Sequence, residues 1–168
     1  MTRIGLLSDT HGYLHPDIFE YFGKCDEIWH SGDIGDIEIA HRLKQFKPLR
    51  AVYGNVDGHE IRSGFCENLR FICEDKSVWI THIGGYPGKY DRSVRDEINR
   101  NPPGLFISGH SHILKVMYDK ELDLLHINPG ASGKFGIHKY LTVVRFNIDC
   151  NEIMNFEVIR LGEKKKVD

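Results

Sequence analysis

The stretch Ile4-Gly5-Leu6-Leu7-Ser8-Asp9-Thr10-His11-Gly12 decides the fold, because an apolar run passes directly into a polar turn. Residues 4–8 predict a buried strand that ends at Asp9. A helical segment is expected next, opened by Pro16 and carrying three apolar residues on one face, Ile18, Phe19 and Phe22. A strand followed by a helix in this way begins a βαβ unit.

The same alternation continues for two more strands. Residues 27–30 predict a strand that stops at Ser31-Gly32-Asp33. Asp36 can then cap a helix with apolar residues at three- and four-residue spacing, Ile39, Ala40, Leu43 and Phe46. Pro48 ends that helix, and residues 49–53 predict a third strand, which stops at Gly54-Asn55. This order predicts a parallel sheet in an α/β protein.

The second half of the chain is richer in strands. Residues 69–73 and 78–81 are joined by a short polar link and predict a hairpin. One helix is expected over about residues 92–99. Further strands are expected over 105–108, 114–118, 124–127, 140–146 and 153–161. Nothing resembles a linker, so we expect one domain over residues 1–168, with a short basic tail from about residue 163.

Composition excludes several classes of protein. The chain has 168 residues, 40% of them hydrophobic, and a formal net charge of −2. A chain of about this length buries roughly 68–70% of its unfolded surface, which gives a sizeable core. No apolar run exceeds three residues, so we expect no membrane span, and the early Asp9 leaves no room for a signal peptide. We therefore expect a cytoplasmic protein.

Neither the basic residues nor the cysteines indicate a special site. The basic run Lys164-Lys165-Lys166 stands alone, and affinity for nucleic acid needs clustered positive charge. A nucleic-acid ligand is therefore disfavoured. The four cysteines, Cys25, Cys66, Cys73 and Cys150, match no Cys-x-x-Cys zinc or redox spacing and are expected to be reduced thiols.

Five polar clusters fall at the ends of predicted strands. Their leading residues are 24, 22, 27 and 28 residues apart, at Asp9, Asp33, Asn55, His82 and His110. His11 and His112 lie two residues after the first and last of these. Parallel strands of one sheet bring their carboxyl ends to a common edge, so we expect the clusters to meet in one crevice.

The side chains in these clusters are typical of a metal site. Two carboxylates, one amide oxygen and four imidazoles suit Mn²⁺, Fe, Zn²⁺ or Ni²⁺ better than Ca²⁺. Seven ligands are too many for one ion but enough for two if a carboxylate bridges them. With two divalent ions, two carboxylates and a bridging hydroxide, the centre keeps one positive charge, which complements a phosphodiester monoanion.

Taken in this order, the motifs resemble the calcineurin-like metallophosphoesterases. The matching motifs are Asp9-x-His11, Gly32-Asp33-x-x-Asp36, Gly54-Asn55-x-Asp57, His82 and Gly109-His110-x-His112. Length and the absence of an added cap resemble the small bacterial and archaeal phosphodiesterases of that family. The resemblance implies a four-layer α/β/β/α sandwich and a metal-dependent phosphodiesterase. It implies two divalent ions, with Mn²⁺ favoured, and in-line attack on a small phosphoester by a bridging hydroxide.

The resemblance also implies a role for each site residue. One ion would be bound by Asp9, His11, Asp33 and His112, and the other by Asp33, Asn55, His82 and His110, with Asp33 as the bridge. Catalysis would rest on Asp33, Asn55 and His110.

Two departures from the family pattern concern the substrate. Many relatives have a histidine after Gly-Asn, where this chain has Val56, which cannot protonate a leaving group. His59 is the nearest substitute in sequence and is the candidate substrate-binding residue. Relatives also often have Gly-His after the fourth cluster's histidine, where this chain has Ile83-Gly84.

Two alternatives of the same fold stay open. One is a non-catalytic interaction module, because a subunit of the eukaryotic retromer coat is similar to this fold and uses its surface for partners. The other is a nuclease of the same superfamily, which the small size and the lack of a basic groove disfavour. Association between copies of this chain also stays open.

Overall fold

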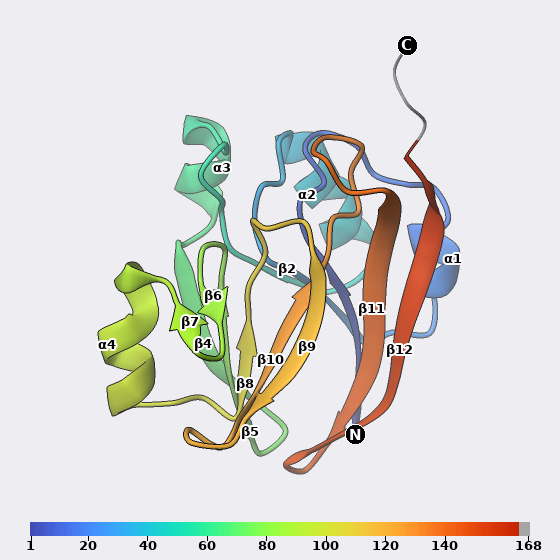
Figure 1. Ribbon diagram of the computed structural model, residues 1–168. Helices are drawn as coiled ribbons and strands as arrows, with labels where there is room; N and C mark the ends of the chain where they lie inside the picture. The colour runs from blue at the N-terminus through green and yellow to red at the C-terminus, as the bar shows by residue number, and fades with distance from the viewer. Residues whose placement is uncertain (165–168) are drawn as a thin grey trace.

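The computed structural model describes residues 1–164, which form two five-stranded sheets, a small hairpin and four helices (Figure 1). In chain order the elements are β1 (Thr2–Leu7), α1 (Ile18–Tyr21), β2 (Glu27–His30), α2 (Ile37–Phe46), β3 (Leu49–Ala51), α3 (His59–Gly64), β4 (Asn68–Cys73), β5 (Lys76–Thr81), β6 (Gly85–Tyr86), β7 (Lys89–Tyr90), α4 (Arg92–Arg100), β8 (Leu105–Ile107), β9 (Leu114–Asp119), β10 (Leu124–Pro129), β11 (Tyr140–Asp149) and β12 (Glu152–Glu163).

Each large sheet has a parallel centre. The first sheet has the order β12-β11-β1-β2-β3, with β1, β2 and β3 parallel and β11 antiparallel to both of its neighbours. The second sheet has the order β4-β5-β8-β10-β9, in which β5, β8 and β10 are parallel and the edge strands β4 and β9 are antiparallel. The predicted parallel sheet of the first three strands is confirmed, as is the hairpin that becomes β4 and β5.

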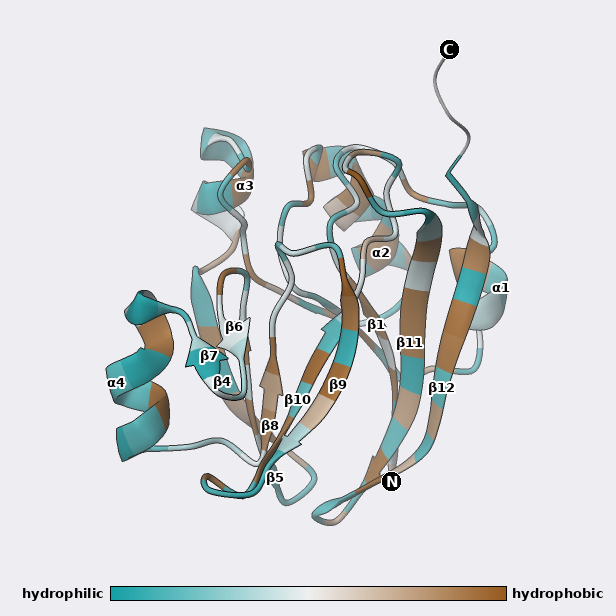
Figure 2. Ribbon diagram, viewed as in Figure 1, coloured by the Kyte–Doolittle hydropathy of each residue, from teal (hydrophilic) through white to brown (hydrophobic). Residues whose placement is uncertain are grey.

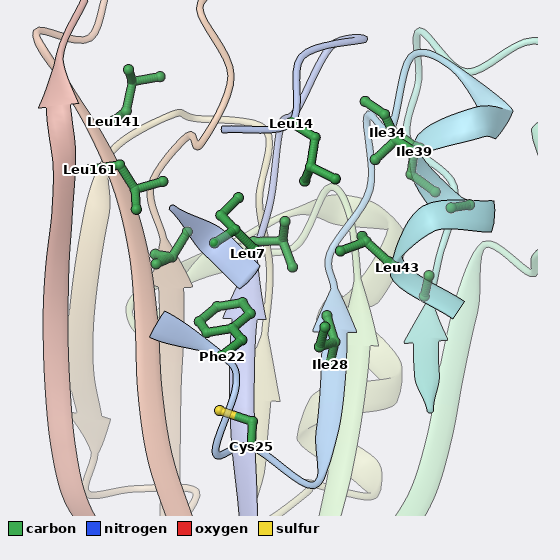
Figure 3. Close-up of a cluster of buried hydrophobic side chains, with 14 of the residues drawn as sticks. Leu7, Leu14, Phe22, Cys25, Ile28, Ile34, Ile39, Leu43, Leu141 and Leu161 are labelled. Atoms are coloured by element: carbon green, nitrogen blue, oxygen red, sulfur yellow. The ribbon is translucent and has the colours of Figure 1, made fainter. Parts of the chain in front are cut away.

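Three apolar clusters separate the layers. One lies under α1 and α2 and includes Phe22, Leu43 and Leu7 (Figure 3). The second contains Leu6 together with residues of the other sheet, and the third joins Phe106 to α4. Adjacent residues of β1, Leu6 and Leu7, enter different clusters because successive strand side chains point to opposite faces. The predicted four-layer α/β/β/α sandwich is confirmed.

Helices cover the outer faces with narrow apolar stripes. In α4 the buried residues are Val94 and Ile98, four apart, and the remaining residues are mostly polar, as the colour of this helix in Figure 2 shows. Asp36 caps α2 as predicted, accepting a hydrogen bond from the Glu38 N–H over 2.9 Å. Both helices thus bury one face, and each begins at an aspartate whose side chain replaces a missing backbone partner.

Short elements depart from the sequence prediction. The helix after Pro16 is only α1, which begins at Ile18. The helix α3 and the hairpin strands β6 and β7 were not predicted. The first has six residues with only Ile61 buried, and the strands have two residues each. Segments this short carry no complete hydrophobic period, so their sequence does not distinguish them from loops.

Two further predictions concern the basic tail and the membrane spans. Glu163 is the last residue of β12, and the predicted basic tail lies outside the described residues from residue 165 onward. Within residues 1–164, no helix has both the length and the apolar composition needed to cross a bilayer.

Two buried histidines predict a dependence of stability on pH. Burial is the main cause that lowers the pKa of His30 and of His126, each to about 4. In the unfolded chain the pKa of histidine is about 6.5. Between pH 6.5 and 4 the unfolded state therefore binds protons that the folded state excludes, and we expect the free energy of unfolding to fall as the pH is lowered.

The expected loss is up to about 3 kcal/mol for each of these histidines over that range. Urea unfolding of the metal-free protein at pH 7 and at pH 4.5 measures it. The variant His126→Gln cannot be protonated and should lose less stability than the parent. Equal losses in the parent and this variant would show that His126 is not the titrating group.

Candidate metal centre

The five polar clusters lie at the carboxyl ends of strands from both sheets. Asp9 follows β1, Asp33 follows β2 and Asn55 follows β3, all in the first sheet. His82 follows β5 and His110 follows β8, which belong to the second sheet. The expectation that one sheet edge gathers all five clusters is therefore wrong. Instead, the parallel strands of two packed sheets end at the same end of the sandwich.

Six of the seven predicted ligand residues form two groups. Within each group, one possible ligand atom per residue lies within 4.8 Å of the others. The first group is Asp9, His11 and His112, and the second is Asp33, His82 and His110.

The two groups adjoin at Asp33. Its Oδ2 atom lies 3.2 Å from His82 Nε2 in its own group and 3.7 Å from His11 Nε2 in the other. His11 Nε2 is in turn 3.1 Å from His112 Nε2. One carboxylate is thus within reach of nitrogens from both groups, which is the geometry that a bridging ligand requires.

Several of these buried atoms lack a partner. Both carboxylate oxygens of Asp9 and the Nε2 atom of His82 make no hydrogen bond of acceptable geometry within residues 1–164. His82 Nδ1 lies 2.8 Å from the Ser31 carbonyl and must donate to it, so Nε2 presents a lone pair to the carboxylates. Burial of unpaired acceptors is costly unless a cation joins them, so the donor set fits divalent metal ions.

The pKa shifts describe the same site with protons in place of metal. Burial acts to lower the pKa of His82, but the Asp33 carboxylate, whose Oδ2 lies 3.2 Å from Nε2, and the charge of Asp9 outweigh it and raise that pKa. Burial acts to raise the pKa of Asp33, but the adjacent His82 ring outweighs it and lowers that pKa. His11 differs, because burial lowers its pKa more than the two carboxylates raise it. The carboxylates therefore favour positive charge at His82 more than at His11.

The backbone at the centre is strained. Five site residues adopt a left-handed conformation, with φ of 54°, 46°, 54°, 66° and 58° at Asp9, His11, Asp33, His110 and His112. Asp and His tolerate this region better than most side chains, yet each such residue still costs about 1–3 kcal/mol. Strain of this kind is maintained only where the surrounding structure fixes it, and here it coincides with the predicted ligands.

Two glycines allow the strand ends to approach closely. A Cβ atom on Gly54 would lie 2.0 Å from Asp33 Oδ1, and one on Gly109 would lie 2.2 Å from Ser8 Oγ. The first glycine brings the turn after β3 against the Asp33 carboxylate, where the Val56 N–H donates to Asp33 Oδ1 over 3.1 Å. The second brings the loop after β8 against the end of β1.

Asp57 and Arg62 hold the turn that carries Asn55. The buried Asp57 carboxylate accepts hydrogen bonds from the N–H groups of Gly54, Ile34 and Gly35 over 2.7, 3.1 and 2.7 Å, which ties this turn to the one after Asp33. The Arg62 guanidinium donates to the carbonyls of Asp57, Gly54 and Asn55 over 2.6, 3.1 and 3.2 Å. Arg62 was not predicted, because α3 itself has no clear sequence pattern.

Asn55 and His59 lie apart from the two groups. Asn55 is exposed and lines a pocket of about 470 Å³ together with His82, which we call the asparagine pocket. His59 begins α3, where its Nε2 lies 3.5 Å from Ser63 Oγ of the same helix. His59 lines neither this pocket nor the one beside His110. The structure therefore brings Asn55 to the edge of the centre and leaves His59 outside it.

Comparison with known proteins identifies the family. The calcineurin-like phosphoesterase superfamily domain matches residues 2–151. The chain belongs to this superfamily. Among its relatives is a probable metallophosphoesterase of Methanocaldococcus jannaschii, 32% identical over 136 residues, which cover 76% of this chain and 67% of the relative. A probable metallophosphoesterase of Methanothermobacter thermautotrophicus is 29% identical over 134 residues, or 76% of each chain.

Solved structures share the fold at low sequence identity. An archaeal phosphodiesterase has a TM-score of 0.75 and 21% identity, with 94% of this chain and 99% of that one covered. A single mutant of Vps29 from Entamoeba histolytica has a TM-score of 0.73 and 15% identity, with 94% and 98% covered. At these identities the likeness shows the fold. Membership of the superfamily and the two candidate groups of metal ligands support a metal-dependent phosphoesterase.

We expect Mn²⁺ to stabilise the protein through the unpartnered atoms of Asp9. Free Mn²⁺ at a concentration of about 100 times its dissociation constant adds about 2.7 kcal/mol to the free energy of unfolding. Asp9→Asn removes the carboxylate and should abolish most of this gain. Urea unfolding with Mn²⁺ and with EDTA measures it for each protein.

A matched control is Asp36→Asn, which alters the cap of α2 but leaves the ligand groups intact. Its basal stability can change, but its gain from Mn²⁺ should equal that of the parent. A full gain in Asp9→Asn would mean that Asp9 binds no ion.

Proposed function

We propose that this protein is a phosphodiesterase that uses two divalent metal ions, with Mn²⁺ as the effective ion. The observation that carries the proposal is the pair of adjoining ligand groups with Asp33 within 4 Å of both. Two-metal hydrolases hold their ions about 3.5–4 Å apart, a spacing that one shared carboxylate can span. Membership of the phosphoesterase superfamily supports the same reaction class.

The proposed ligands would divide between the ions as the resemblance to the calcineurin-like metallophosphoesterases implies. Asp9, His11, Asp33 and His112 would hold one ion, and Asp33, Asn55, His82 and His110 the other. When bound, such ions would act as Lewis acids on phosphate oxygens and would lower the pKa of bound water to about 7, which would supply a nucleophile at neutral pH.

The chain's own groups then orient the centre and the substrate. Ser31 fixes the tautomer of His82 through its carbonyl, so that Nε2 points to the centre. Asn55 contributes an oxygen without charge, which keeps the centre positive enough to attract a phosphodiester monoanion. Asn55 and His110 are both exposed, unlike Asp9 and Asp33, so the substrate approaches from their side.

The residue at position 56 restricts the leaving group. Val56 is 53% exposed beside Asp33, and its side chain holds no proton to donate. The leaving group therefore departs without receiving a proton, and its rate of departure depends on the stability of the free alkoxide or phenoxide. We propose that the enzyme favours esters whose leaving alcohol or phenol has a low pKa.

Asp33→Asn should abolish hydrolysis of bis-(p-nitrophenyl) phosphate while the fold survives. The amide keeps the size of the side chain but lacks the charge that joins the two ions. Initial rates with added Mn²⁺ test this, with circular dichroism to verify folding. Asp26→Asn, which breaks an exposed pair with Arg3, is the control expected to keep full activity. Turnover by folded Asp33→Asn at the parental rate would exclude a bridging role.

Val56→His should restore a proton donor beside the centre. General acid catalysis contributes about 10²- to 10⁴-fold where the leaving group needs a proton. Across a series of aryl methyl phosphates, we expect the rate of the parent to fall steeply as the pKa of the leaving phenol rises. The rate of the variant should fall less steeply along the series. On the ester with the poorest leaving group, the variant's rate should exceed that of the parent by at least about tenfold. Parallel slopes would mean that position 56 does not limit proton transfer.

A non-catalytic interaction module is the second candidate, and the Vps29 structures are the observation that favours it. Such a module would bind metal yet hydrolyse no ester. Mn²⁺ binding without turnover across a panel of phosphomonoesters and phosphodiesters would therefore favour it over the enzyme. Cleavage of single- or double-stranded DNA or RNA would instead indicate a nuclease.

A further inference from the structure

The strand β9 forms an unprotected edge of the second sheet (Figure 1). Proteins protect such edges with short strands, charged side chains or bulges, because free backbone groups pair readily with another chain. Of the other edge strands, β3 has three residues, β4 exposes Arg70, and β12 exposes Glu157 and has two register irregularities against β11. The strand β9 is regular over six residues. Its exposed side chains are all uncharged: Leu114, Val116 and Tyr118.

The hydrogen bonds of β10 show which backbone groups of β9 are free. The Leu125 N–H donates to the Gly104 carbonyl over 3.1 Å, and the Ile127 carbonyl accepts from the Ser108 N–H over 3.1 Å. Both of these β10 residues therefore direct their backbone groups toward β8. Successive residues of a strand direct theirs to opposite sides, so the alternate residues of β10 face β9. Their partners in β9 are Lys115, Met117 and Asp119.

The remaining residues of β9 consequently direct their N–H and C=O groups away from the sheet. Within residues 1–164, the N–H groups of Val116 and Tyr118 have no hydrogen-bond acceptor. Their side chains are 42% and 56% exposed. The Tyr118 hydroxyl donates to Asp123 of the same chain, which leaves the ring as its free surface. This edge thus offers a partner both backbone hydrogen bonds and apolar contact.

The opposite face of β9 carries two charges that lack an ion pair. Lys115 Nζ lies 3.4 Å from the centre of the Tyr86 ring, and Asp119 accepts a hydrogen bond from the Tyr90 hydroxyl over 2.7 Å. Neither Lys115 nor Asp119 forms a salt bridge within residues 1–164. They lie four residues apart on one strand, a separation of about 13 Å, which is too far for them to pair with each other.

A second copy of the chain matches this edge in one register. An antiparallel pair about a two-fold axis at Met117 places Val116 of each copy opposite Tyr118 of the other. Each of these pairs can exchange two backbone hydrogen bonds. The same register places Lys115 of each copy opposite Asp119 of the other. A shift by one residue would set free groups against groups already bonded to β10, and a shift by two would remove the pairing of these charges.

We propose that two copies of this chain associate through β9 and join their second sheets into one continuous sheet. A second copy supplies apolar partners on one face and opposite charges on the other at the same time, which an unrelated extended peptide does not. Contacts about a two-fold axis are self-complementary, so each favourable pair occurs twice. None of the candidate metal ligands belongs to β9, and the proposal is independent of the proposed function.

The molar mass in solution tests the interface. In sedimentation equilibrium, the parent should approach twice the 19.4 kDa of one chain as its concentration rises. Lys115→Glu replaces two attractive pairs of the dimer by two repulsive ones and should weaken association at least about tenfold. Lys24→Glu makes the same change of charge at an exposed lysine outside β9 and should match the parent. A parent that stays monomeric, or undiminished association by Lys115→Glu, would overturn the proposal.

Mixing two variants tests the register. Asp119→Lys should also weaken self-association, because the charges that face each other in its dimer are all positive. In a mixture of Asp119→Lys and Lys115→Glu, every charged pair across the interface again has opposite signs, so dimers should form. Circular dichroism verifies the folding of each variant, since Asp119 also bonds to Tyr90. No gain in mass on mixing the two folded variants would overturn the register and the proposal with it.

Amide hydrogen exchange and a proline variant locate the interface without a change of charge, and they decide the proposal if Asp119→Lys does not fold. The N–H groups of Val116 and Tyr118 should exchange more slowly in the dimer than in the monomer. A dimer in which they exchange as fast as in the monomer would overturn the proposal. Val116→Pro removes an outward N–H, which an edge strand tolerates, and should be folded and monomeric. Dimerisation of Val116→Pro at the parental strength would also overturn the proposal.

Discussion

The structure depends on keeping two carboxylates, those of Asp9 and Asp33, buried and close to imidazole nitrogens. Asp9 is fully buried and Asp33 is 2% exposed. Removing a charge from water costs several kcal/mol unless an opposite charge compensates it. No lysine or arginine forms a salt bridge with either carboxylate within residues 1–164, where the neighbouring basic groups are all histidines. Divalent cations bound by these residues would supply that compensation.

The backbone strain at the centre is confined to loops, and an extensive apolar core supports these loops. The left-handed residues of the centre occupy loops, whereas β1, β2, β5 and β8 place fully buried apolar side chains beneath them. Trp29, for example, is one residue before His30 in β2 and packs edge-to-face on Phe71 of the other sheet. The core thereby fixes the separation of the two sheets, and that separation sets the distance from Asp33 to His82. A looser core would therefore change the geometry of the candidate ligand groups.

Most of the fold, and the convergence of six of the seven candidate ligand residues, could be predicted from the sequence, for different reasons. The strand before Asp9 and the helix after Asp36 have complete hydrophobic periods and end or begin at recognisable turn or capping residues. The grouping of the candidate ligand residues could be predicted because these residues recur at strand ends. The sequence could not predict that these strands belong to two different sheets. A spacing of about 25 residues between strand ends is the same whether the next strand joins the same sheet or the facing one. Arg62 was also missed, since its partners are backbone carbonyls, which leave no mark on the sequence.

The residue at position 56 shows how the proposed function constrains the substrate. Val56 is exposed beside Asp33, and its side chain offers no proton to a leaving group. Where no acid assists the leaving group, selectivity must come from the leaving group itself or from binding of a remote part of the substrate. A phosphodiesterase built on this centre would therefore depend on the acidity of the leaving alcohol, or on contacts made beyond the exposed residues Asn55 and His110.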